Sequence, residues 1–363
     1  MSQFSFAVVK DFLTPIFPRL RKTQFTNLAL GVFGLAESQS GLLSEIVRGF
    51  PTDYVLAVAH KHRLKRWNRF LANPHFRPET WLTAWVAWCV DRFTDKGRLL
   101  IALDWTGLPG NRMCLVAAIP FRGRAIPLYW HVVSYRTMET SQNRLEEQFI
   151  RNLLVLLPFG VTPIILADRG FGRAQFMNFL IGMKLRFVLR VKGEVYITTH
   201  KGKKRKLKTV KTRPGWIRWY PNVTYREDGI VTGVNIAATV ADDGQDPWYF
   251  VTNLADKRQV VAYYTARFRI EEFFKDAKHQ LGLEQLQTPH DTRVHGLLFV
   301  ACVTYGLLML VGLGLETNPV LQRCLITGGR SVASCIWLAV KTIRYGLAPE
   351  GLWQSVISFA GGP

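Results

Sequence analysis

The sequence is poor in cysteine and in acidic residues, and both shortages exclude classes of protein. Five cysteines are scattered over 363 residues without a CxxC pair. An odd, scattered set argues against a disulfide framework and against a cysteine-based zinc site, and it suits a reducing compartment. The eight histidines show no metal-ligand spacing either. A metal bound by this chain would therefore depend on oxygen ligands.

The shortage of acidic residues leaves the chain strongly basic. Lys and Arg number 47 against 26 Asp and Glu, which gives a formal net charge of +21. Such a surplus favours a polyanionic partner, either nucleic acid or an anionic membrane surface, although a basic soluble protein without such a partner is the alternative. The hydrophobic share of 48% excludes a disordered tail, and the length allows about two domains.

Long uncharged stretches are almost absent, with one exception at residues 297–315, "LLFVACVTYGLLMLVGLGL". This run has about the length that spans a bilayer. The alternative, which we favour, is a helix buried in a large domain, because the segment before it is polar. The N-terminal segment has Lys10 and Asp11 among its apolar residues and no basic region before them, so we expect a helix of the mature protein.

The first part of the chain, residues 1–96, reads as helical and basic. Its segment "KHRLKRWNRFLANPHF" interleaves cations with apolar residues, so one helix face can pack while the other offers charge to phosphates. A solvated basic face is the alternative. The cations in question are Lys61, Arg63, Lys65, Arg66 and Arg69.

From residue 97 the pattern changes to a mixed α/β sheet. Apolar runs predict strands over 98–105, 113–121, 125–133, 162–168 and 185–191, with helices over 141–158, where Ser141 is the expected N-cap, and 172–184. The predicted organisation is helical over 1–96, the first part of an α/β core over 97–192, a strand-rich insertion over 193–255, core helices over 256–315 and a C-terminal helical region over 316–363.

Two aspartates each close a predicted buried strand, Asp104 in "LDWTGLPG" and Asp168 in "ADRGFGR". Ligands of open α/β sheets bind at the carboxyl ends of strands, so these two carboxylates can converge there. The alternative is that each is a turn former or helix cap.

A third carboxylate lies in the predicted helix "YYTARFRIEEFFKDAK", residues 263–278. On one helix Tyr264, Arg267, Glu271 and Lys278 would fall within about 60° of one another, whereas Glu272 lies about 100° away. Ion pairing on a solvated face is the alternative to a functional site. Three carboxylates from separate elements would suit Mg²⁺, with two ions about 4 Å apart and Mn²⁺ as an alternative ion.

These motifs resemble DDE transposases encoded by bacterial insertion sequences. The spacing of Tyr264, Arg267, Glu271 and Lys278 is similar to the Tyr-Arg-Glu-Lys signature of one branch. "ALDWT" and "LADRGF" resemble the first and second acidic motifs of that family, and "GRAIPLYW" its third-strand segment.

The resemblance implies a ribonuclease-H-like catalytic core whose third acidic residue follows a strand-rich insertion, here Asp104, Asp168 and Glu271. It implies cleavage at transposon ends by water, then joining of the 3′ ends to target DNA. The implied partners are double-stranded terminal inverted repeats, target DNA and a second copy of the chain, in the cytoplasm at the nucleoid and without a membrane. Expected DNA contacts are Tyr264, Arg267, Lys278, Arg169, the basic residues of 61–69, and Lys203, Lys204 and Arg205.

Relatives stack a flipped base on an aromatic residue of the insertion, which makes Trp216, Trp219 and Trp248 the base-stacking candidates. Base stacking contributes about 1–3 kcal/mol per base, and burial in a small β domain is the alternative for each. Two other functions stay open on the sequence alone. One is a non-catalytic DNA-binding relative such as a repressor, and the other is a basic membrane-attached protein.

Overall fold

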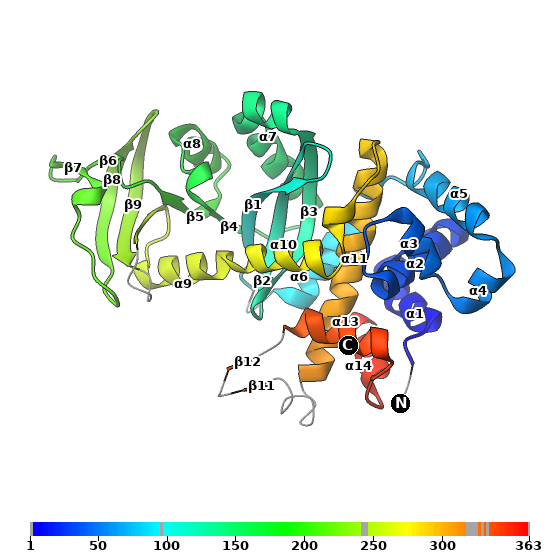
Figure 1. Cartoon of the computed structure of the whole chain (residues 1–363). Coiled ribbons are helices and arrows are strands. Elements are labelled where there is room, and N and C mark those ends of the chain that lie inside the picture. Colours follow the sequence, from blue (N-terminus) through cyan, green and yellow to red (C-terminus); the bar gives the residue numbers. More distant parts are fainter. Residues whose placement is uncertain are drawn as a thin grey trace. The chain divides into compact units, whose positions relative to one another are not determined.

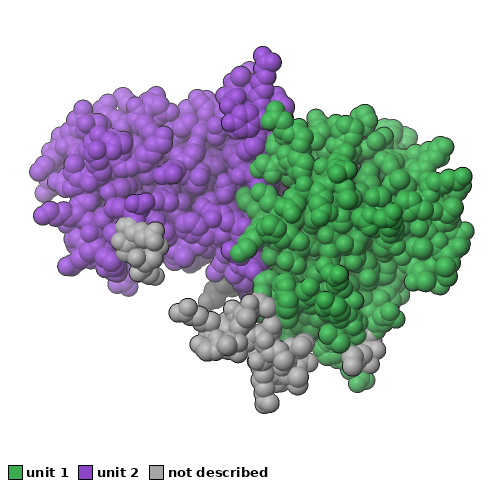
Figure 2. All heavy atoms as spheres, viewed as in Figure 1, with its two compact units in different colours: residues 1–92, 107–112, 273–363 green, residues 93–106, 113–272 purple. Residues whose placement is uncertain are grey.

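The computed structural model describes residues 3–94, 97–240, 246–316, 326–327, 330–331 and 334–361. Part of the predicted C-terminal helical region over 316–363 therefore lies outside the described residues. The chain divides into two compact units (Figure 2). The first comprises Met1–Arg92, Gly107–Arg112 and Phe273–Pro363, and the second comprises Phe93–Thr106 and Met113–Glu272.

The second unit is built on a ten-stranded sheet with the order β3-β2-β1-β4-β5-β10-β9-β8-β6-β7 (Figure 1). Strands β1, β4 and β5 run parallel, and their registers pair Leu103 with Ala167 and Ala167 with Leu189. β4, most of β5 and Ile101 to Leu103 of β1 are buried, which explains the continuous apolar runs there. The first five strands are β1 (Leu100–Leu108), β2 (Arg112–Phe121), β3 (Arg124–Ser134), β4 (Ile164–Ala167) and β5 (Arg186–Val191).

The segment predicted to be rich in strands continues the same sheet. Strand β10 (Pro247–Thr252) pairs antiparallel with β5 on one side and with β9 (Ile230–Val240) on the other. Three further strands follow outward from β9, namely β8 (Arg218–Arg226), β6 (Tyr196–Thr198) and β7 (Lys204–Lys206).

Helices cover both faces of this sheet, with α7 (Tyr135–Leu156) and α8 (Ala174–Gly182) on one face and α9 (Lys257–Arg267) on the other (Figure 1). The prediction that Ser141 caps α7 is wrong. Ser134 is the cap, because its Oγ accepts from the backbone N–H of Thr137 at 3.1 Å, while Ser141 lies inside the helix at a kink. The N-terminus of α9 is capped by Asp256, whose Oδ1 accepts from the backbone N–H of Arg258 at 2.8 Å.

The helix predicted over 263–278 is two helices in the structure. Helix α9 ends at Arg267, and α10 (Arg269–His279) begins after Phe268, which forms the junction. The predicted stripe of Tyr264, Arg267, Glu271 and Lys278 therefore does not lie on one uninterrupted helix. Residues Arg269 to Glu272 belong to the second unit, and the rest of α10 belongs to the first.

The first unit is mainly helical and is organised around α11 (Asp291–Glu316), which contacts α2, α5, α13 and α14. Helix α6 also approaches α11 closely, because a Cβ on Gly306 would lie 2.5 Å from the ring of Trp85. The other helices are α1 (Phe6–Ile16), α2 (Lys22–Ser38), α3 (Leu43–Arg48), α4 (Thr52–Ala57), α5 (His60–Leu71), α6 (Pro78–Phe93), α13 (Cys335–Tyr345) and α14 (Leu352–Gly361); β11 (Ile326–Thr327) pairs with β12 (Arg330–Ser331).

The uncharged run at residues 297–315 lies within α11. Among the described residues, α11 is the one helix long and apolar enough to cross a membrane, and 94% of its most hydrophobic window is buried inside the protein. Burial of this extent favours a core helix over a membrane span.

Candidate functional site

Asp104 and Asp168 lie side by side, where the pairing between β1 and β4 stops. Leu103 and Ala167 are register partners on the parallel strands β1 and β4, so the next residue on each strand is one of the two aspartates. Asp104 Oδ1 accepts from the backbone N–H of Trp105 at 2.9 Å. Asp168 caps a short 3₁₀ helix (Arg169–Phe171), and its Oδ1 accepts from the N–H of Gly170 at 2.8 Å. The two carboxylates are thus close together, since the charge of Asp168 contributes to the raised pKa of Asp104. The prediction that Asp104 closes its strand is wrong, because β1 continues through Asp104 to Leu108.

A single guanidinium joins Asp104 to Glu271. Arg267, at the end of α9, donates from Nη1 to Asp104 Oδ2 at 3.0 Å and from Nη2 to Glu271 Oε1. The Arg267 side chain is only 4% exposed, whereas that of Glu271 is 51% exposed. Residues from β1, α9 and the first turn of α10 therefore form one ionic cluster, which we call the Arg267 cluster.

The Arg267 cluster carries more negative charge than one guanidinium neutralises. Burial raises the pKa of Asp104 from 3.8 to about 6; the charge of Arg267 opposes this rise, and the charge of Asp168 adds to it. The raised pKa means that the ionised form of this carboxyl group is disfavoured at its buried position. An additional cation beside Asp104 would remove that disadvantage.

The donor set fits a divalent cation chemically, because three carboxylates are the hard oxygen ligands that Mg²⁺ and Mn²⁺ prefer. Within the part of the chain that the structure describes, no group of three His, Cys, Asp or Glu side chains is close enough to hold an ion. Arg267 contacts one oxygen of Asp104 and one of Glu271. Glu271 is half exposed, so its contact with Arg267 can be exchanged for another cation.

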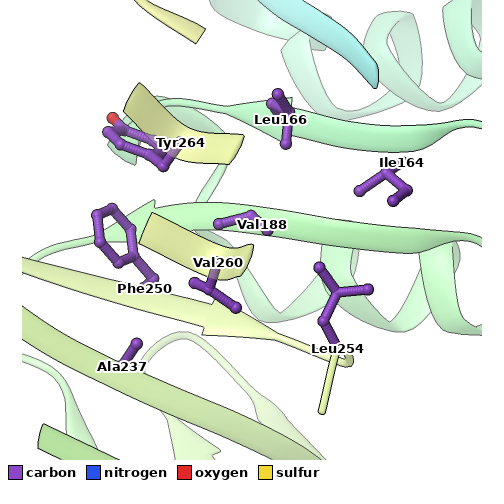
Figure 3. Close-up of a cluster of buried hydrophobic side chains, with 8 residues drawn as sticks. All are labelled: Ile164, Leu166, Val188, Ala237, Phe250, Leu254, Val260 and Tyr264. Atoms are coloured by element: carbon purple, nitrogen blue, oxygen red, sulfur yellow. The ribbon is translucent and has the colours of Figure 1, made fainter. Parts of the chain in front are cut away.

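Tyr264 anchors the helix that carries Arg267. Its side chain is fully buried and packs, with Val260 one turn earlier, on a cluster drawn from β4, β5, β9 and β10 (Figure 3). The predicted DNA contact at Tyr264 thus falls on a core residue. The spacing of Val260 and Tyr264 on one helix face is the sequence signal for this packing.

Two other residues of the predicted site lie outside the Arg267 cluster. Lys278 is half-buried on the part of α10 that belongs to the first unit. Arg169 is exposed on the 3₁₀ helix after Asp168. Glu272, the neighbour of Glu271, pairs instead with Arg124 at 3.2 Å.

The basic helix predicted over residues 61–69 is α5 in the first unit. Its Arg63 is buried and donates from Nη1 to the carbonyls of Val55 and Val58, at 2.5 and 2.7 Å, which stabilises the end of α4. The other four predicted cations are exposed, and three of them line a hollow of about 450 Å³ between α2 and α5. The exposed cations are Lys61, Lys65, Arg66 and Arg69, of which the last three line the hollow.

In the basic run of the insertion, residues 201–213, some cations are exposed and others bind partners within the protein. Lys203 and Lys204 are exposed. Arg205 is half-buried and donates to the hydroxyl of Tyr220 at 3.1 Å. Lys206 and Lys208 pair with Glu194.

The three tryptophans considered for base stacking are all half-buried, in different surroundings. Trp216 lies between the guanidinium groups of Arg213 and Arg218, whose carbons are 4.9 and 4.1 Å from its ring centre. Trp219 and Trp248 pack against the buried cluster of Figure 3. Trp248 is the one whose ring contacts Tyr264, with ring centres 5.7 Å apart.

Sequence reasoning missed a fourth carboxylate near the two aspartates. Glu146 on α7 is 1% exposed and accepts a hydrogen bond from Trp105 Nε1 at 2.9 Å. It also pairs with Arg173, the last residue of the "DRGFGR" segment. Nothing in "RLEEQF" distinguishes Glu146 from Glu147 except the phase of the helix, which the kink at Ser141 shifts.

Comparison with known proteins agrees with this geometry. No curated protein matches the chain. Residues 95–307, more than half of the sequence, match the family model described as the transposase DDE domain. The matched segment contains Asp104, Asp168, Arg267, Glu271 and Glu146. The chain therefore belongs to the transposase DDE domain family.

Proposed function

We propose that the protein is a DNA transposase of the insertion-sequence branch with the Tyr-Arg-Glu-Lys signature. In this proposal it cuts DNA at transposon ends and joins the 3′ ends to target DNA. The observation that carries the proposal is the Arg267 cluster, in which Arg267 bridges Asp104 and Glu271, with Asp168 close to Asp104. Membership of the transposase DDE domain family supports the same reaction class.

The proposed core is ribonuclease-H-like. The order β3-β2-β1-β4-β5, with β1, β4 and β5 parallel, supports this assignment. Under this proposal the strands of 193–255 are an insertion between the second and third acidic residues, and residues 1–96 form a DNA-end-binding domain.

We assign Asp104, Asp168 and Glu271 as the residues that would hold one or two divalent cations, Mg²⁺ or Mn²⁺. When bound, such ions activate an attacking oxygen and stabilise the leaving one in phosphodiester cleavage. Arg267 keeps the two carboxylates from β1 and α10 together before ions and DNA arrive, and its fork of N–H donors suits a phosphate afterwards. Arg169 and Lys278 are proposed as further phosphate contacts.

The proposal extends to partners and location. It includes a homodimer on DNA, binding of terminal inverted repeats and target DNA, and a cytoplasmic, nucleoid-associated location. Trp216, Trp219 and Trp248 are all proposed as base-stacking candidates, since arginines lie over the ring of Trp216 and also over that of Trp248.

The function is tested by incubating the protein with an end-labelled duplex that carries the terminal repeat. We expect nicking at the transposon end with Mg²⁺ and none with EDTA. A repressor would bind the duplex in both conditions and nick it in neither, and that outcome would reject the proposed activity.

A second test concerns the exposed cations of α5. The double substitution Lys65→Ala/Arg69→Ala is expected to weaken terminal-repeat binding and to lower the slope of log K against log salt by about 2, since each lost phosphate contact removes about 0.9. Binding titrations at several salt concentrations measure both quantities. The matched control is Lys10→Ala/Arg19→Ala, which removes the same charge from exposed positions outside α5. Equal slopes for the two variants would remove α5 from the DNA interface.

A further inference from the structure

Glu146 is a buried carboxylate on α7. It binds one residue of each aspartate segment, "LDWTGLPG" and "ADRGFGR", and one residue of its own helix. Its Oε1 accepts from Trp105 Nε1 at 2.9 Å and from Gln142 Nε2 at 2.8 Å, and its Oε2 pairs with Arg173 Nη2. Burial raises the pKa of Glu146, while Arg173, Trp105 and Gln142 oppose that rise. A charge buried to this extent is tolerated only when it is fully paired.

From Glu146 a continuous path of hydrogen bonds leads to Asp168. Arg173 reaches Glu146 with Nη2 and the carbonyl of Gly170 with Nη1. The N–H of Gly170 in turn donates to Asp168 Oδ1 at 2.8 Å. The turn that presents Asp168 is thereby fastened to α7.

On its other side Glu146 is connected to Asp104. Trp105, whose indole N–H donates to Glu146, also donates its backbone N–H to Asp104 Oδ1 at 2.9 Å. The indole contact thus holds the residue directly after Asp104 on α7. One carboxylate therefore joins β1, at Trp105, to the segment after β4 through side chains, beyond the point where the pairing of these strands stops at Leu103 and Ala167.

Its neighbour Glu147 provides the comparison. Glu147 is half-buried and accepts from Gln175 Nε2, on α8, at 2.8 Å; within the described part of the chain it makes no hydrogen bond or ion pair with either aspartate segment. Adjacent glutamates on one helix thus have different surroundings, and only one of them joins the two aspartate segments.

We infer that Glu146 and Arg173 are positioning residues, which fix the separation and orientation of Asp104 and Asp168. The expected effect on cleavage rests on the proposed function. The positioning itself does not, because the hydrogen-bond path exists in the protein without DNA or metal. Groups of this kind, which act through the ligating residues, typically change metal affinity or activity by 10–100-fold when they are replaced.

The direct test is amide hydrogen exchange of the protein without metal or DNA. In Glu146→Gln we expect exchange about tenfold faster at the amides of Trp105 and Gly170, the scale of one lost hydrogen bond to a charged group, and little change elsewhere. Glu147→Gln, the same chemical change one residue later, should leave both amides unchanged. Equal exchange in the two variants, or uniform acceleration along the chain, would overturn the inference.

Cleavage then separates positioning from stability. Glu146→Gln is expected to lower the cleavage rate by about 10–100-fold, with terminal-repeat affinity within about twofold of the parent. The double variant Glu146→Gln/Arg173→Met leaves no unpaired buried charge, so we expect its melting temperature to recover relative to Glu146→Gln while cleavage stays low. Recovery of cleavage together with melting temperature would indicate a structural role only.

Two milder variants keep the test decisive if Glu146→Gln does not fold. Trp105→Phe keeps the ring and removes only the indole donor, and Arg173→Lys keeps the charge but cannot reach Glu146 and Gly170 together. Faster exchange at Gly170 is expected in Arg173→Lys and at Trp105 in Trp105→Phe; unchanged exchange in both would reject the path. If the parent protein binds the terminal-repeat duplex but does not nick it with Mg²⁺ while these exchange results hold, the proposed function fails and the positioning role stands.

Discussion

Asp104→Asn, Asp168→Asn and Glu271→Gln are each expected to lower cleavage of a terminal-repeat duplex by about a thousandfold or more, as for essential groups that act as a unit. Each amide keeps the size of the side chain but removes the charge needed to hold a divalent cation. Since the reaction needs all three carboxylates at once, the double and triple variants should be no worse than the single ones. Cleavage is measured by single-turnover nicking in Mg²⁺.

Glu272→Gln is the matched control for this prediction. It is the same substitution on the next residue of α10, and Glu272 pairs with Arg124 instead of with the Arg267 cluster. We expect its cleavage rate to fall less than about threefold, the scale of a partly exposed ion pair. Binding of the duplex should be retained in all four variants. Substantial cleavage by any variant of the three carboxylates, or equal loss in Glu272→Gln, would show that the catalytic carboxylates are assigned wrongly.

Arg267→Met is expected to destabilise the metal-free protein by about 3–5 kcal/mol at pH 7.5, the range for removing one partner of a buried ion pair. The loss comes mainly from Asp104, whose side chain is 18% exposed and would keep a charge without a partner. The contact with Glu271 contributes less, because that side chain is half exposed. Urea denaturation of both proteins in EDTA measures the difference.

This destabilisation should depend on pH in a definite direction. The pKa of Asp104 is raised from 3.8 to about 6, so the stability associated with protonated Asp104 is fully present below about pH 4 and is lost as the pH rises through 6. Arg267 lowers the pKa of Asp104, so in Arg267→Met this loss of stability occurs at higher pH than in the parent protein. The gap between parent and variant is therefore expected to be largest above about pH 7 and to narrow as the pH falls through 6.

Two further variants check the cause of this loss. Arg258→Met removes a charge from an exposed position on the same helix and should leave stability unchanged within about 0.5 kcal/mol. Asp104→Asn/Arg267→Met removes the buried charge together with its partner and should recover most of the lost stability. If the double variant is as unstable as Arg267→Met, the packing of the Arg267 stem, not its charge, holds the cluster together.

The sequence predicted the parts of the site that depend on buried parallel strands. Asp104 and Asp168 follow continuous apolar runs, and such runs became the paired segments of β1 and β4. It did not predict that β1 continues beyond Asp104 to Leu108. The position of Glu271 relative to Arg267 was also predictable, because four residues make about one helical turn. The break at Phe268 was not, since Phe268 keeps a helical backbone conformation and no Gly or Pro marks the junction.

Features that depend on tertiary packing escaped prediction. In the sequence Arg63 resembles the other cations of residues 61–69. Among them Arg63 alone is buried, because it donates to two carbonyls at the end of α4. Glu146 reads like Glu147, and only the kink at Ser141 and the approach of Trp105 and Arg173 give it a different environment. Side-chain partners from distant segments leave no local pattern, so the sequence alone cannot distinguish such residues.

The place of β10 in the sheet has a consequence for how this protein can evolve. Although β10 comes last among the strands of the large sheet, it lies directly beside β5, and the chain passes from it through Asp256 into α9. The pairing of β10 with β5 therefore fixes where the chain enters α9, and the outer strands β9, β8, β6 and β7 lie beyond that point in the sheet. Insertions, deletions or exchanges at β6 to β8 can therefore be accommodated without shifting Arg267 or Glu271. Under the proposed function, new end-sequence preferences can arise in these outer strands while the arrangement of Asp104, Arg267 and Glu271 is inherited unchanged.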